Sequence, residues 1–158
     1  MLNLSRYLLI FLLLASSAYS QTINMRFGQG SGDTKGKIIS GSYHGFIWKD
    51  FVIGQFTAGT LNGDNIQGTD YTFFYELSIG AEIKLPIGLY AKFNQGVALL
   101  NETTNRLDSK LQLPTTLSAG FHHKNKHLGI FWKHFSSGTT SPRNRGQEYI
   151  GLELGFTL

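Results

Sequence analysis

The sequence of 158 residues contains no cysteine and only three prolines. A secreted chain without disulfides needs another source of stability, such as a large core or a closed sheet. Charged residues are also sparse, and a net charge of +4 is too small to indicate nucleic-acid binding. No segment is apolar over the length that a membrane-spanning helix requires. These absences exclude a disulfide-stabilised scaffold and a helical membrane protein.

The first twenty residues have the pattern of a secretory signal peptide. Arg6 supplies a positive charge, residues 7–15 form a short apolar run, and Ala18-Tyr19-Ser20 is a small-x-small cleavage site. We therefore expect cleavage before Gln21 and a single domain over residues 21–158. The alternative is that the N-terminus forms a buried helix.

The rest of the chain is rich in glycine and aromatic residues and alternates between apolar and polar positions. Eight candidate strands lie at about Thr22–Gln29, Lys37–Trp48, Phe51–Thr60, Tyr71–Ile83, Gly88–Leu100, Gln112–His123, His127–Ser136 and Gln147–Leu158. Their connections are alternately long and short, which is typical of outer-membrane barrels. The pattern predicts an all-β fold, an eight-stranded antiparallel up-and-down transmembrane β-barrel with both termini on the periplasmic side.

The two faces of the strands indicate which side meets lipid. In residues 75–85 and 89–99, large apolar side chains occupy one parity, with Gln95 the exception. Five charged residues fall on the other parity, where a lumen allows them to pair: Glu76, Glu82, Lys92, Lys133 and Glu153. The alternative, a soluble lipocalin-type barrel, requires the opposite arrangement, with apolar side chains inside.

Three histidines lie close together in the sequence at a predicted tight turn. His122, His123 and His127 alternate there with Lys124 and Lys126. Polar and cationic residues gather naturally at a membrane interface, so we expect no metal site.

The most informative segment is His134-Phe135-Ser136, followed twelve residues after the serine by Glu148. Residues two apart on a strand share a face, so His134 and Ser136 point the same way. A hairpin register that pairs 134 with 148 places Glu148 beside the imidazole. The three groups then form a serine, a base and an orienting carboxylate on the apolar face. In a membrane barrel that face meets lipid.

Residues 134–148, HFSSGTTSPRNRGQE, resemble the C-terminal signature of PagL-type lipid A 3-O-deacylases. That family signature has His-x-Ser-Asn, a Pro/Asn/Gly-containing loop and a glutamate at this spacing. The resemblance implies an outer-membrane esterase of Gram-negative cells that removes a 3-hydroxyacyl chain from lipid A of lipopolysaccharide. It makes Ser136 the nucleophile, His134 the general base and Glu148 the orienting carboxylate. The implied chemistry needs no cofactor.

The oxyanion site is expected in the loop after the serine. Asn144 matches a family asparagine implicated in the oxyanion hole, and backbone N–H groups near Ser137 and Gly138 are further donors. Ser137 stands where the family has asparagine, a difference that bears on the catalytic rate more than on the reaction type. The chain also ends on Leu158, where membrane barrels commonly end on an aromatic residue.

Four further residues are candidates for substrate binding. Arg143 and Arg145 are placed to hold lipid A phosphates, with plain surface charge as the alternative. Trp132 and Ile150 flank the triad on its own face and can line an acyl groove. A place in the aromatic girdle, or simple contact with lipid, explains Trp132 and Ile150 equally well.

Two other function classes remain open. One is a non-catalytic small barrel for adhesion or surface stabilisation, and the other is an acyl hydrolase or acyltransferase that acts on phospholipid. The expected partners are lipid A in the outer leaflet and the outer membrane itself, and a homodimer is left open.

Overall fold

The computed structural model describes residues 21–62, 71–104, 106–137 and 145–158. The predicted signal peptide, residues 1–20, lies outside them. No helix among the described residues is long and apolar enough to cross a membrane. The strands are β1 (Gln21–Gly30), β2 (Lys37–Trp48), β3 (Val52–Asn62), β4 (Thr72–Lys84), β5 (Leu89–Leu100), β6 (Leu111–Gln112), β7 (Thr115–His123), β8 (Lys126–Phe135) and β9 (Gln147–Thr157).

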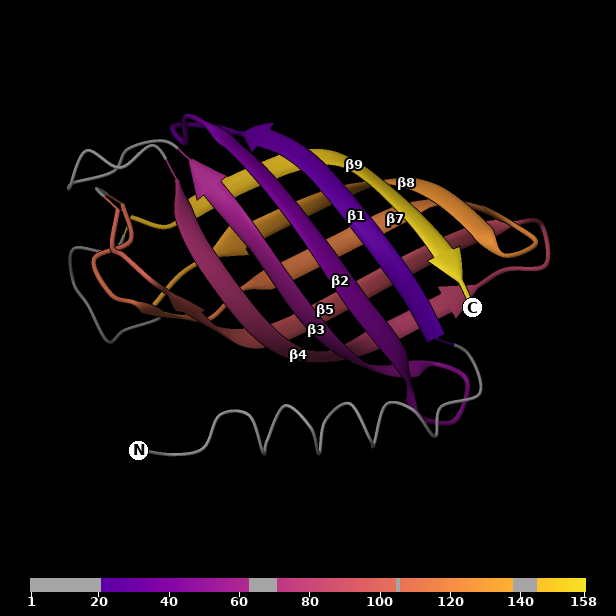
Figure 1. Ribbon diagram of the computed structural model, residues 1–158. Coiled ribbons are helices and arrows are strands. Elements are labelled where there is room, and N and C mark those ends of the chain that lie inside the picture. Colours follow the sequence, from indigo (N-terminus) through magenta and orange to yellow (C-terminus); the bar gives the residue numbers. More distant parts are fainter. Residues whose placement is uncertain (1–20, 63–70, 105, 138–144) are drawn as a thin grey trace.

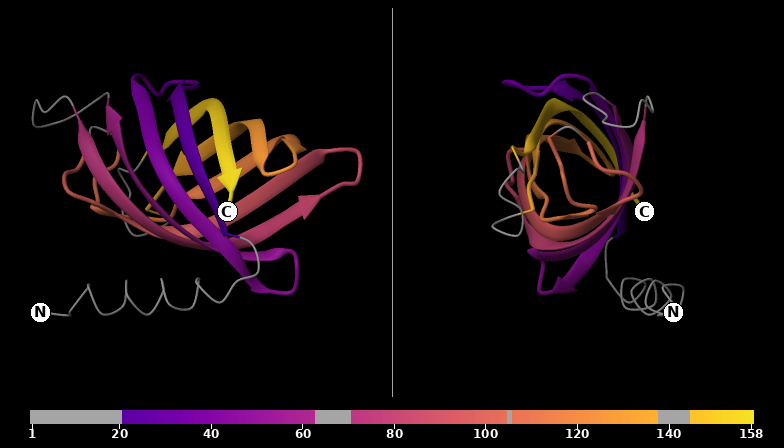
Figure 2. Two further views of the ribbon diagram at one scale, coloured as in Figure 1. Left: turned by 45° about the vertical axis from the view of Figure 1, so that its right-hand side comes forward. Right: turned by 90° about the vertical axis from the view of Figure 1, so that its left-hand side faces the viewer.

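The strands close into a barrel. Each long strand pairs antiparallel with the next long strand along the chain, the short β6 pairs with β5, and β1 also pairs with β9, so that the barrel closes. Figure 1 shows the tilted strands from the side, and the right-hand view of Figure 2 shows the closed barrel from one end. The prediction of an eight-stranded antiparallel barrel is confirmed. The chain enters β1 and leaves β9 at the end with the short turns, as expected for a periplasmic end.

One predicted strand is interrupted. Residues 112–123 were expected to be continuous, but the strand breaks at Leu113 and Pro114 into β6 and β7. Proline has no N–H to donate to the ladder, so the pairing with β5 lapses there. The register on β5 is the same on both sides of the break, and Pro114 still accepts a hydrogen bond from Gly96 N at 3.0 Å. β6 and β7 therefore act as one strand of the barrel.

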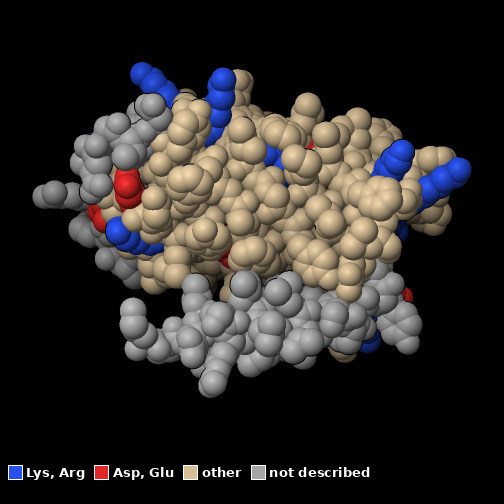
Figure 3. Space-filling model, in the orientation of Figure 1, with Lys and Arg blue, Asp and Glu red and all other residues tan. Residues whose placement is uncertain are grey.

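The outer wall is apolar. Exposed large hydrophobic side chains occur on every long strand except β3, including Met25, Ile39, Tyr75, Phe93, Leu117, Ile130 and Leu152. In Figure 3 the visible wall is almost entirely uncharged, and charged atoms gather toward the two ends. This arrangement rules out the soluble lipocalin-type alternative and confirms the predicted lipid-facing surface.

The lumen holds charged side chains in pairs. Glu153 forms ion pairs with Arg26 (Oε2 to Nε, 2.5 Å) and with Lys92 (Oε1 to Nζ, 2.8 Å). Lys133 Nζ lies 2.5 Å from Glu76 Oε2. All five side chains are almost completely buried. A buried charge is costly unless an opposite charge and hydrogen bonds compensate it. The lumen is therefore a packed polar core in which each ion depends on its partners.

An apolar cluster lies inside the barrel, behind the ends of β8 and β9. Phe135 meets Phe74 edge-on, with ring centroids 5.2 Å apart, and lies 6.3 Å from the ring of Tyr149. The whole cluster consists of Ile38, Leu61, Phe74, Ala98, Leu100, Leu107, Phe131, Phe135 and Tyr149. Because Phe135 and Tyr149 directly follow His134 and Glu148, this packing fixes the backbone that carries those two outward-facing residues.

Candidate active site

The β8–β9 hairpin brings His134 and Glu148 together. They are direct partners in the antiparallel register, and His134 Nδ1 lies 3.4 Å from Glu148 Oε1. This distance is slightly longer than an N–H···O hydrogen bond of about 2.7–3.2 Å, so a small side-chain rotation completes the bond. The two side chains are 29% and 42% exposed on the outer wall. The carboxylate is therefore positioned to orient the imidazole through Nδ1, which leaves Nε2 for proton transfer.

Two neighbours hold the imidazole ring. Trp132 stacks on it, with ring centroids 5.8 Å apart and planes inclined by 13°. Gly146 approaches from the β8–β9 connection with a φ of +67°, and a Cβ built on it falls 2.8 Å from His134 Cε1. Only glycine combines this backbone conformation with so close an approach. The ring position therefore depends on both residues.

Ser136 directly follows the last residue of β8, so the predicted strand end is one residue too long. The ladder nevertheless continues, because Leu113 N donates to Ser136 O at 2.5 Å. Ser136 keeps the parity of Trp132 and His134 and is half-buried, whereas Ser137 on the opposite parity is buried. The serine thus lies on the lipid-facing side, one step beyond the histidine.

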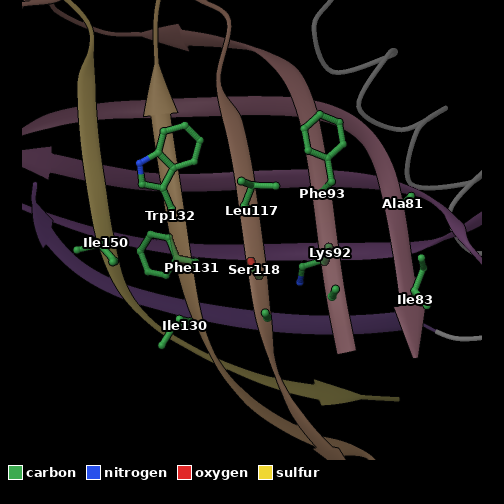
Figure 4. Close-up of a pocket in the computed structure, with 12 residues that line it drawn as sticks. Ala81, Ile83, Lys92, Phe93, Leu117, Ser118, Ile130, Phe131, Trp132 and Ile150 are labelled. Carbon is green, nitrogen blue, oxygen red and sulfur yellow. The ribbon is translucent and has the colours of Figure 1, made fainter. Parts of the chain in front are cut away.

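An apolar groove begins beside this site on the outer wall. Trp132 and Ile150 lie on its rim, as Figure 4 shows, together with Leu117 and Phe93. Its volume is about 420 Å³. The small side chain of Ala119 leaves room between the larger ones, and this is why the wall is hollowed here.

The groove continues along the barrel wall away from the site. A second hollow of about 820 Å³ shares Ile83, Ala91, Ala119 and Ile130 with the first. It extends to Phe121 near the short-turn end. From Trp132 onward, a long acyl chain therefore has a continuous apolar path along the wall.

The match to a protein family extends over most of the barrel. Residues 29–157 match the family model described as lipid A 3-O-deacylase (PagL). The chain belongs to this family. PagL-family proteins are ester hydrolases that act on lipid A, and family and fold together identify this chain as an outer-membrane β-barrel protein. No functionally curated protein matches the chain.

Solved structures share the barrel. The N-terminal β-barrel domain of Pseudomonas aeruginosa OprF has a TM-score of 0.64 at 18% identity, with 89% of this chain and 98% of that chain covered. The outer membrane enzyme PagL gives 0.61 at 14%, with 85% and 98% covered. Yersinia pestis Ail gives 0.55 at 13%, with 88% and 99% covered. At these identities the likeness concerns the fold alone.

The PagL-family signature is only partly within the described residues. Asn144, Gly138 and Arg143 lie outside them. Arg145 is exposed, and its backbone N donates to the carbonyl oxygen of Arg106 at 3.0 Å. The structure therefore brings together the strand-borne part of the predicted site.

Arg106 links three loops beside the site by hydrogen bonds. No sequence pattern singled out this residue. Its Nε donates to Gly146 O at 2.9 Å, and its guanidinium also donates to Asp33 O at 3.2 Å. Gly146 in turn touches the imidazole of His134. Arg106 thereby fixes a backbone segment on which the ring position depends, although it lies more than twenty residues from the motif.

Glu148 has a similar support that sequence reasoning missed. Its backbone N donates to Thr34 Oγ1 at 2.9 Å, and its carbonyl oxygen accepts from Ser31 N at 3.0 Å. Both contacts come from the β1–β2 loop. They hold the first residues of β9 against the β1–β2 loop.

The histidines at the short-turn end point in different directions. His122 Nε2 lies 3.3 Å from Leu85 O, whereas His127 Nε2 lies 2.6 Å from Asn24 Oδ1. Within the described ranges, no group of three or more His, Asp or Glu side chains has the geometry of a metal site.

Proposed function

We propose that this barrel is a serine esterase that removes an ester-linked 3-hydroxyacyl chain from lipid A, with Ser136, His134 and Glu148 as its catalytic residues. The observation that carries the proposal is an imidazole–carboxylate pair on a largely apolar, lipid-facing wall. Such polar groups are costly in contact with hydrocarbon unless they have a role there. Membership of a lipid A deacylase family supports the same chemistry.

In the acylation step, Ser136 Oγ attacks the ester carbonyl carbon. His134 Nε2 takes the hydroxyl proton, and Glu148 stabilises the imidazolium through Nδ1. The tetrahedral intermediate collapses with cleavage of the bond between the carbonyl carbon and the sugar oxygen. His134 returns the proton to that oxygen, which leaves as the sugar hydroxyl.

In the deacylation step, water attacks the acyl-serine. His134 accepts a proton from this water and then donates it to Ser136 Oγ as the acyl–oxygen bond breaks. The products are the 3-hydroxy fatty acid and the free serine, so the enzyme is regenerated without a cofactor.

Residues of the β8–β9 loop complete the proposed site. Asn144 and the backbone N–H groups of Ser137 and Gly138 bind the developing oxyanion, a contribution for which the loss of one donor typically costs about 10²–10³ in rate. Arg143 and Arg145 hold lipid A phosphates by charge-assisted hydrogen bonds.

The acyl chain lies in the groove that starts at Trp132 and Ile150. Lipid A in the outer leaflet already has its chains along the barrel wall, so the substrate needs no extraction into water. The hollow beside the site supports this placement.

The test is mass spectrometry of lipid A from cells that express the wild type, Ser136→Ala or His134→Ala. We expect the wild type to yield lipid A lighter by one 3-hydroxyacyl chain and both variants to lose this product. His123→Ala, an exposed histidine at the opposite end of the barrel, is the matched control and retains it.

The same spectra discriminate the rival functions. Altered phospholipids with unchanged lipid A indicate a phospholipid hydrolase, and no change in either indicates a non-catalytic barrel. Deacylation that persists in Ser136→Ala contradicts the nucleophile assignment.

A further inference from the structure

Two polar side chains on the lipid-facing wall have no place in the catalytic scheme. Thr115 Oγ1 donates to Gln95 Oε1 at 2.6 Å, and the pair lies on the outer surface. Gln95 is the exception to the apolar parity of β5. Their neighbours on the same face are large and apolar: Ile79, Phe93, Val97, Leu113 and Leu117. Polar groups facing hydrocarbon are costly when their hydrogen bonds are incomplete.

The pair continues the row that contains the catalytic residues. In the strand register Gln95 pairs with Thr115, Thr115 with His134, and His134 with Glu148. Adjacent strands are about 4.8 Å apart, so Gln95 lies about 10 Å from the histidine across the wall. Four polar residues thus form one unbroken row that extends from the site toward β4.

This row lies between the nucleophile and the acyl groove. One step toward the long loops, Ser136 stands opposite Leu113. One step the other way, Trp132, Leu117 and Phe93 form the rim of the groove, as the labels in Figure 4 show. A chain with its carbonyl at Ser136 and its tail in the groove must cross the row within its first few carbon atoms.

The pair has hydrogen-bonding capacity to spare. The Thr115 hydroxyl donates to Gln95, so its oxygen remains an acceptor. The amide nitrogen of Gln95 carries two donors, and no hydrogen bond from it is present among the described residues. A hydroxyl group, which both donates and accepts, satisfies both side chains at once.

We propose that Gln95 and Thr115 form a subsite that hydrogen-bonds the 3-hydroxyl group of the acyl chain being cleaved. The inference rests on the proposed function, since it assumes an acyl-serine at Ser136. A 3-hydroxyl is two carbon atoms beyond the carbonyl, which is the part of the chain that crosses the row. The subsite makes the enzyme selective for hydroxylated over unsubstituted acyl esters.

The experiment compares two synthetic substrates that differ only in this hydroxyl: a glucosamine phospholipid with an ester-linked 3-hydroxytetradecanoyl chain and one with a tetradecanoyl chain. The ratio of their kcat/KM values is measured in mixed micelles. We expect the wild type to favour the hydroxylated ester by about tenfold or more, as for one hydrogen bond. Thr115→Val and Gln95→Leu each bring the ratio close to one.

Two controls make the ratio specific. Thr115→Ser keeps the hydroxyl and is expected to keep the selectivity, and Ile79→Val alters the apolar neighbour at the end of the row without changing the ratio. An unchanged ratio in Thr115→Val and Gln95→Leu, or an equal loss on both esters, overturns the subsite while leaving the esterase intact. Failure of the wild type to cleave either ester overturns the proposed function and the subsite together.

Discussion

Replacement of Gly146 by alanine tests whether catalysis depends on the observed position of the His134 ring. The added Cβ falls 2.8 Å from His134 Cε1 and 3.3 Å from Nε2. Because carbon atoms in contact stay about 3.5–4.0 Å apart, the ring must retreat by roughly 0.7–1.2 Å. A displacement of about 1 Å can cost about 10²-fold in rate. We therefore expect Gly146→Ala to lower kcat about a hundredfold.

The matched control is Gly32→Ala. Gly32 has a φ of +59°, close to the +67° of Gly146, but nothing lies within 4 Å of its added Cβ. Both variants therefore carry the cost of a left-handed alanine, about 1–2 kcal/mol, and only one displaces the imidazole. The assay is release of the 3-hydroxy fatty acid by purified protein in detergent, with heat-modifiable gel mobility to verify the folded barrel.

We expect Gly32→Ala to stay within a few-fold of the wild-type rate. If folded Gly146→Ala is as active as Gly32→Ala, the contact with the ring has no catalytic importance and the reasoning is refuted.

Three further changes probe the supports of the site, the lumen and the groove. Arg106→Ala removes the side-chain hydrogen bonds to Gly146 O and Asp33 O and should lower kcat about tenfold with little change in KM, measured by steady-state kinetics; a change confined to KM contradicts this positioning role. Glu153→Gln leaves Arg26 and Lys92 without their anionic partner and should destabilise the barrel by about 3–5 kcal/mol, seen as a lower urea midpoint in detergent, and an unchanged midpoint argues against an ion-dependent core. Ala119→Phe fills the groove and should shift the preference toward shorter acyl chains in a chain-length series, whereas an unaltered preference means that the chain lies elsewhere.

Much of the barrel was predictable because it depends on a period of two. When one face of a strand meets lipid, its charged side chains must lie on the other face. In β4 this places Glu76 and Glu82 inside the barrel. The structure confirms it, with Leu77 and Ile79 exposed on the outer wall. The same alternation places His134 and Glu148 on one face of the last hairpin, and the structure supplies the register that sets them opposite each other.

The rest depends on contacts that no local pattern encodes. Pro114 breaks a ladder whose alternation alone predicts an unbroken strand. Arg106 and Thr34 reach the site only because barrel closure brings three loops to one rim, and neither residue belongs to a periodic segment. Gln95 was visible in the sequence as an exception to the alternation. Its hydrogen bond to Thr115, on a neighbouring strand, became evident only in the structure.

The most direct test of an outward-facing catalytic serine is active-site labelling in detergent micelles. A long-chain alkyl fluorophosphonate reacts with an activated serine with loss of fluoride, and peptide mass spectrometry locates the adduct. We expect a single label on Ser136 that disappears in His134→Ala. A label on another residue, or lipid A deacylation by a protein whose Ser136 never reacts, contradicts the account.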